Sequence, residues 1–204
     1  MWSLLVALAL PGDIIGWDCS VERDLGGRHY QLIQSVEGTG PEARKRGGYL
    51  RIGWDSASTP FPNIVDLLYA DGALSSDTPD LFNIFVPTRK KRAKPQLWIA
   101  MAGGEARRIE SGPQLLVMHF GGNLQYMQSQ NRDLNRALWS AGSFTMTVKD
   151  EKGRVIGSRN VAFDRDEVAR VVRESVPELD AKLADPTNPK NNCRGYDFSR
   201  YIVV

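Results

Sequence analysis

Short segments in which apolar and polar residues alternate dominate the first two thirds of the chain. Alternation with a period of two places neighbouring side chains on opposite faces, which is typical of a β-strand with one buried face. The pattern predicts strands at 17–22, 29–36, 48–54, 64–70, 81–86, 96–102, 105–110, 114–120, 144–150 and 154–163. The sequence therefore favours a protein built mainly from β-sheet.

Glycine-containing turns separate several of these segments. Gly26-Gly27, Asp71-Gly72, Gly103-Gly104 and the stretch 150–153 each lie at the end of a predicted strand. Glycine accepts the positive φ that tight hairpin turns require. We therefore expect neighbouring strands to pair as antiparallel hairpins.

Helical periodicity appears only in the last third of the chain. Segment 131–142 carries apolar residues on one face and ends at a glycine, which is a common helix stop. Segment 164–176 opens with Asp164 and Glu167 at capping-box spacing. Ser175 and Glu178 repeat that spacing, which predicts a second, shorter helix beginning near Pro177.

The order of these elements limits the fold class. Many short strands followed by helices, without alternation of the two, argue against a doubly wound parallel sheet. We predict a mainly β protein: an antiparallel β-sandwich or partly open barrel with two or three peripheral helices in the C-terminal third. No linker divides the strands, so residues 17–204 are expected to form one domain after a candidate leader at 1–16.

The chain begins with an apolar run, LLVALAL (4–10), followed by Pro11-Gly12. A membrane-spanning helix needs about 20 apolar residues, so no transmembrane span is visible. The run has the length of the apolar core of a secretory signal. No Lys or Arg precedes it and no clean cleavage site follows, so a first buried strand of the mature domain remains the alternative.

Net charge is close to neutral, at +2, so the whole molecule is not built to neutralise a polyanion. Any attraction to an anion must come from a local patch. One basic run lies between two predicted strands, and it consists of Arg89, Lys90, Lys91, Arg92 and Lys94. It is either an anion-binding loop, with salt-sensitive binding, or a solvated loop that protects strand edges.

The two cysteines, Cys19 and Cys193, lie near opposite ends of the chain. In a reducing compartment such cysteines are most often inert core residues, whereas in an oxidising compartment an even number is expected to pair. A disulfide would tie the first strand, in which Trp17 is expected to be buried on the same face as Cys19, to the polar tail. The alternative, a zinc site, would need His29 and His119 as well, and no local ligand spacing supports it.

No catalytic motif is present. The sequence contains no Gly-x-Ser-x-Gly, HExxH, GxxxxGK or GxGxxG pattern, so we expect no cofactor or metal and assign no catalytic residue. His119, at the end of an apolar strand, is either a general base at a sheet rim or a polar residue that ends the strand.

Trp17-x-Cys19 after an apolar leader and the hairpin-and-helix stretch at 143–170 resemble the invasion-associated locus B-like proteins, which are small exported β-sandwich proteins of alphaproteobacteria. The resemblance implies export and a non-enzymatic role in the cell envelope, and it carries over no catalytic residue. The family tends to carry further cysteines in its middle, whereas this chain has none between 19 and 193.

We therefore expect a periplasmic or secreted protein that acts by binding, with an envelope protein or an anionic surface as partner. Two alternatives stay open. One is a hydrolase-type enzyme with a site near His119. The other is a polyanion or membrane-surface binder that uses residues 89–94. No specific nucleic-acid motif is present.

Overall fold

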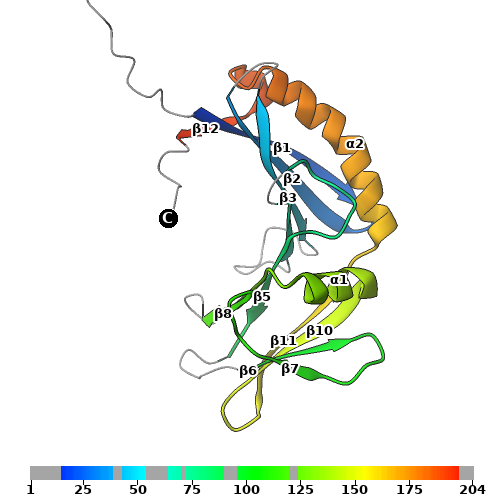
Figure 1. Cartoon of the computed structure of the whole chain (residues 1–204). Helices are drawn as coiled ribbons and strands as arrows, with labels where there is room; N and C mark the ends of the chain where they lie inside the picture. The colour runs from blue at the N-terminus through cyan, green and yellow to red at the C-terminus, as the bar shows by residue number, and fades with distance from the viewer. Residues whose placement is uncertain are drawn as a thin grey trace, which may run out of the picture.

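The computed structural model describes residues 15–38, 43–53, 64–69, 72–89, 96–119 and 124–197 (Figure 1). The predicted leader lies almost entirely outside the described residues, and Ile15 and Gly16 already belong to the first strand. In the described part, the chain forms two sheets, two α-helices and a short 3-10 helix (Pro189–Asn191), and every strand pairing is antiparallel. No helix in this part is long and apolar enough to cross a membrane.

The larger sheet runs through the whole molecule. Its eight strands follow the order β12 (Arg194–Asp197), β1 (Ile15–Leu25), β2 (Arg28–Glu37), β3 (Arg44–Gly53), β4 (Ile64–Tyr69), β5 (Leu81–Pro87), β9 (Leu124–Ser129) and β8 (Leu115–His119). The smaller sheet has the order β11 (Val155–Ala162), β10 (Ser143–Lys149), β6 (Gln96–Met101) and β7 (Arg107–Ile109). Neither sheet closes into a barrel, and the predicted antiparallel sandwich with helices near the C-terminus is confirmed.

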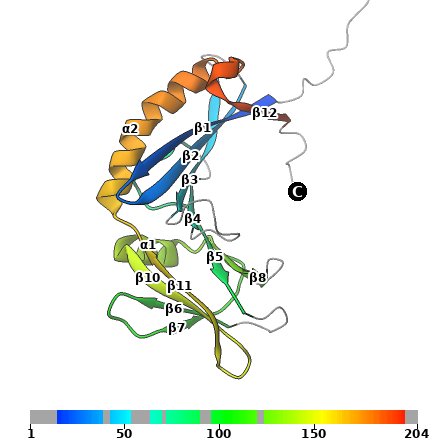
Figure 2. The same ribbon diagram turned by 180° about the vertical axis from the view of Figure 1, so that it is seen from behind.

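The strand register gives the larger sheet one mainly apolar face, which we call the inner face. Opposite residues on neighbouring strands, such as Leu32, Leu50, Leu67 and Phe82, are all fully buried there. Helix α2 covers this face over β1 and β2, and the smaller sheet covers it at the β5–β9 end (Figures 1 and 2). One core cluster extends under both covers. The opposite, outer face of the larger sheet points away from both.

Helix α1 (Arg132–Ala141) has the predicted boundaries. The Asn131 side chain accepts a hydrogen bond from the backbone N–H of Leu134, which caps the first turn. Gly142 ends the helix with a φ of 61°, the left-handed conformation that glycine adopts without strain.

Helix α2 (Arg165–Ala184) corrects the prediction of two separate helices. The predicted cap holds, since Asp164 accepts hydrogen bonds from two backbone N–H groups of the first turn. The helix then continues through Pro177 for 20 residues, and Ser175 is a fully buried helical residue rather than a cap. The buried stripe that packs on β1 and β2 continues from Val168 to Leu183 on both sides of the proline, so packing outweighs the lost backbone hydrogen bond.

Two strands, β9 and β12, were not predicted, and Trp17 is only partly buried rather than buried. The residue opposite Trp17 on the edge strand β12 is Gly195, which has no side chain to cover the indole. Instead the backbone of Gly195 packs against the ring, because a Cβ there would lie 3.2 Å from a ring carbon.

Candidate functional site

A row of polar residues crosses the outer face of the larger sheet. Register places one polar residue of each of six neighbouring strands opposite the next, and we call these residues the polar row: Glu22, Gln31, Arg51, Asp66, Asn83 and Gln128. The exposed Leu116 of the edge strand β8 continues the line. Polar side chains on a solvent-facing sheet surface are ordinary, but two members of this row are buried.

Arg51 and Asp66 form the centre of the row. The Asp66 carboxylate accepts hydrogen bonds from Arg51 Nε at 2.9 Å and from Nη2 at 3.3 Å, which is a bidentate ion pair. The Asp66 side chain is only 4% exposed, whereas that of Arg51 is 37% exposed. The pair thus joins a buried carboxylate to a guanidinium that reaches solvent.

Two tyrosines flank this pair on the outer face. The Arg51 guanidinium carbon lies 5.3 Å from the centre of the Tyr49 ring, which is within cation–π range. Burial, and then the negative charge of Asp66, raise the pKa of the Tyr49 phenol and also that of Tyr126. Both phenols therefore stay protonated at neutral pH and act as neutral hydrogen-bonding groups.

Asn83 lies between Asp66 and Gln128 in the row. The residue is 9% exposed, and its amide oxygen Oδ1 has no hydrogen-bond partner among the described residues. A buried acceptor without a donor costs about 1–3 kcal/mol, so such groups are rare unless a ligand or water completes them. The Asn83 oxygen therefore distinguishes the polar row from an ordinary solvent-exposed sheet face.

The row supplies fixed hydrogen-bond donors and acceptors, and the charges of Arg51 and Asp66 at its centre cancel. The described residues contain no group of three His, Cys, Asp or Glu side chains that could hold a metal ion. The row contains no Ser, Cys or Lys that could act as a nucleophile.

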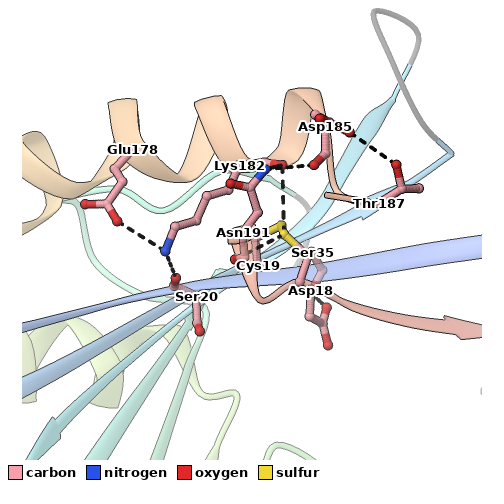
Figure 3. The surroundings of a disulfide bond; sticks show 10 residues. Asp18, Cys19, Ser20, Ser35, Glu178, Lys182, Asp185, Thr187 and Asn191 are labelled. Atoms are coloured by element: carbon pink, nitrogen blue, oxygen red, sulfur yellow. Dashed lines mark hydrogen bonds and ion pairs between the residues drawn. A yellow bond between two sulfur atoms is a disulfide. The ribbon is translucent and has the colours of Figure 1, made fainter. Parts of the chain in front are cut away.

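The two cysteines form a disulfide (Figure 3). Cys19 lies in β1 and is fully buried, and Cys193 directly precedes β12. A hydrogen bond from Lys182 Nζ to the Ser20 carbonyl, at 2.8 Å, joins α2 to the same stretch of β1. The Asn191 amide also donates to the Asp185 carbonyl at 2.8 Å. The disulfide, the end of α2 and the tail therefore meet in one region, which we call the clasp.

The other residues singled out from the sequence do not come together. His29 Nδ1 lies 2.9 Å from an Asp24 carboxylate oxygen at the exposed β1–β2 hairpin. His119 ends β8, and its side chain lies outside the described residues. Both cysteines are bonded to each other, so the alternative of a zinc site that uses them does not hold.

Only Arg89 of the basic run is described; Lys90, Lys91, Arg92 and Lys94 lie outside the described residues. Arg89 is exposed and lines a hollow of about 530 Å³ between the end of β5 and the start of β11. Its backbone N–H donates to the Ile156 carbonyl at 2.8 Å, which anchors the start of the run to the smaller sheet. Thr88 is buried beside it, and its hydroxyl has no partner among the described residues.

Sequence reasoning missed the polar row. Asp66 and Asn83 are each the single polar residue within an apolar strand, in IVDLLY and LFNIFV. That pattern is a usable signal, because a polar residue that interrupts a buried run needs a partner. Their alignment with Arg51 and Gln128 depends on strand register, which the sequence does not give.

No protein-family model matches this chain, and no curated protein or solved structure is significantly similar to it.

Proposed function

We propose that this protein is exported and acts by binding a ligand or partner on the outer face of the larger sheet, without catalysis. The observation that carries the proposal is the polar row, on the face turned away from the core. There Arg51 pairs with the buried Asp66 carboxylate, and the amide oxygen of Asn83 has no hydrogen-bond partner among the described residues. Such convergent polar groups, held on rigid strands, favour recognition.

The clasp supports the part of the proposal that concerns location. Disulfides persist in oxidising compartments and are rare in the cytosol. The Cys19–Cys193 bridge links positions 174 residues apart, so it encloses most of the chain. A periplasmic or secreted location, and the envelope-associated role of the locus B-like proteins, fit this bridge.

Site-specific photo-crosslinking in the cells that make the protein tests the binding role. A photo-crosslinking amino acid replaces Gln128 in the polar row, and in a matched control it replaces Thr147, an outward-facing residue of the smaller sheet. We expect adducts from position 128 and none from 147. Equal adducts from both positions, or none from 128, would contradict the proposal. Intact-mass measurement of the same protein checks the disulfide and the mature N-terminus.

A second candidate function is binding of a polyanion or anionic membrane surface through residues 89–94. Exposed Arg89 at the rim of the hollow favours this function, as does the neighbouring Thr88 hydroxyl, which has no partner in the described part of the chain. Reversal of the five positive charges should abolish adsorption to vesicles that contain anionic lipid, and salt should weaken it in the unchanged protein. Adsorption that survives charge reversal would exclude this function.

A further inference from the structure

The spacing and composition of the polar row narrow the chemistry of the ligand. Neighbouring strands in a sheet are about 4.8 Å apart, so the row presents a new polar side chain at that interval along a straight line. One sugar unit of an extended glycan has about the same length as this interval. Three of the six side chains are carboxamides (Gln31, Asn83 and Gln128), and each can donate and accept hydrogen bonds.

The electrostatics at the centre of the row favour a ligand without charge there. The Arg51 guanidinium is already neutralised by a bidentate pair with Asp66, and that pair uses Nε and Nη2. An anionic ligand would have to compete with the buried Asp66 carboxylate, and a cationic ligand would have to compete with Arg51. The carboxamide oxygen of Asn83 needs a donor, and a hydroxyl group supplies one without bringing a charge.

Aromatic rings border the row on both sides. Tyr49 precedes Arg51 by two residues in β3, and Tyr126 precedes Gln128 by two residues in β9, so all four side chains share the outer face. Tyr49 lies opposite Leu68 on the neighbouring strand, and Tyr126 lies opposite Phe85. These two pairs fall on opposite sides of the polar row, so the two tyrosine rings do as well. Tyrosine provides a rigid, partly apolar surface on which the C–H face of a sugar ring can pack.

We propose that the polar row binds a neutral glycan chain, which lies across the strands with its hydroxyl groups hydrogen-bonded to Gln31, Asn83 and Gln128. This proposal rests on the proposed binding function of the outer face and names the class of ligand. The Asn83 oxygen, which has no partner among the described residues and is covered in the free protein, receives a hydroxyl hydrogen once the neighbouring side chains shift in the complex. The Arg51–Asp66 pair keeps the centre of the row neutral.

Affinity electrophoresis of the full, disulfide-bonded protein tests the proposal. The probes are dextran, mixed-linkage β-glucan and galactomannan as neutral polysaccharides, and polygalacturonate as an anionic one. We expect at least one neutral polysaccharide to retard the protein, with little change between about 0.05 and 0.5 M salt, because no counterions are released. Asn83→Ala and Gln128→Ala should each weaken retardation on the order of tenfold.

Two variants separate a loss of polysaccharide binding from a loss of folding. Gln128 is partly exposed, so Gln128→Ala is expected to keep the far-UV circular dichroism of the unchanged protein even if Asn83→Ala does not. Thr147→Ala, on the outward face of the smaller sheet, is the matched control and should be retarded like the unchanged protein.

The outcomes separate this proposal from the function on which it rests. Failure of all three neutral polysaccharides, retardation by polygalacturonate alone, or equal retardation of Gln128→Ala would overturn the glycan assignment. If crosslinking at position 128 nevertheless yields a protein adduct, the binding face stands and its ligand is a protein. If neither experiment detects a ligand, both proposals fall.

Discussion

The inner face of the larger sheet is covered in two different ways. Over β1 and β2 a single helix, α2, packs on the sheet, and ion pairs surround the contact: Arg23–Glu178, Arg28–Glu167 and Lys45–Asp180. At the β5–β9 end a second sheet covers the face, together with the aromatic contacts of Phe163 with Trp139 at 5.2 Å and Phe82 at 6.4 Å.

The two kinds of cover stabilise the helix end (β1 and β2 under α2) and the sandwich end (β5 and β9 under the smaller sheet) in different ways. Where a helix lies on a sheet, the edge of the contact stays open to solvent, and we call this edge the open rim. In each of its three ion pairs, the more exposed side chain is between 21% and 48% exposed. Such pairs contribute about 0–1 kcal/mol each. Between the two sheets the contact is made mainly by apolar side chains, such as Val86, Leu97 and Met146. The helix end therefore depends more on the disulfide, and the sandwich end depends more on apolar packing.

The largest expected effect is at the sandwich end. Phe163 is 6% exposed and joins α1 to β5 through its two ring contacts. Phe163→Ala should lower the free energy of unfolding by roughly 3–5 kcal/mol, because it leaves a cavity. Urea unfolding measures the loss, and Val155→Ala, at a 59% exposed position, should stay within about 0.5 kcal/mol. A small loss for Phe163→Ala would mean that the sandwich end does not depend on apolar packing.

The next effect is at the helix end. Replacement of both cysteines, Cys19→Ala with Cys193→Ala, should lower the free energy of unfolding by roughly 2–5 kcal/mol. Much of that loss reflects the freedom that the unfolded chain regains, since the bridge spans 174 residues. Hydrogen exchange should show the loss first in β12 and at the end of α2. Uniform loss across both sheets would remove the distinction between the two ends.

The sequence predicted the parts of this architecture that local chemistry determines. The turn glycines Gly26, Gly27 and Gly103 all have positive φ, and they join antiparallel strands as expected. The pairing of Cys19 with Cys193 was also within reach, because two cysteines allow only one intramolecular bridge.

The missed parts depend on distant contacts. Strand β9 (LQYMQS) buries Gln125 and Ser129 on the inner face, so its polar residues conceal the apolar alternation. Strand β12 lacks an alternating apolar pattern, and it forms because its backbone pairs with the edge strand β1. The polar row appears only when six strands are placed in register. Local patterns therefore give the elements, and pairing gives the candidate site.

A smaller effect tests a buried contact beneath α2. The Tyr30 hydroxyl donates to Glu167, which also pairs with Arg28 at 3.0 Å. Tyr30→Phe should cost about 1–2 kcal/mol at pH 7, because a hydrogen bond to a charged group is lost.

The cost of Tyr30→Phe should also depend on pH. Burial, and then Glu167, raise the pKa of Tyr30 above its ordinary value of 10.0. The native state therefore holds this proton more tightly than the unfolded chain, so the contribution of Tyr30 is present below pH 10 and declines as the pH rises further. Urea midpoints at pH 7 and 10.5 should show a smaller difference between the two proteins at the higher pH. A difference that is constant or grows would contradict the role assigned to the hydroxyl.

The smallest effect is expected at the open rim itself. Arg23, through its hydrogen bond, and Lys182 lower the pKa of Glu178 below its ordinary value of 4.5. The unfolded chain then binds this proton more readily, so the contribution of Glu178 is present above pH 4.5 and is lost as the pH falls through the lower, native value. The side chain is 42% exposed, which limits that contribution to about 1 kcal/mol at most.

Glu178→Gln should therefore lower stability slightly at pH 7 and should flatten the decline of stability between about pH 5 and pH 3. Glu174→Gln, at an exposed position one turn earlier on α2, provides the control and should leave the decline unchanged. A loss of several kcal/mol for Glu178→Gln would mean that charge pairs, rather than the disulfide and the apolar stripe of α2, hold the helix on the sheet. The helix end would then be held mainly by charge pairs, and the sandwich end by apolar packing.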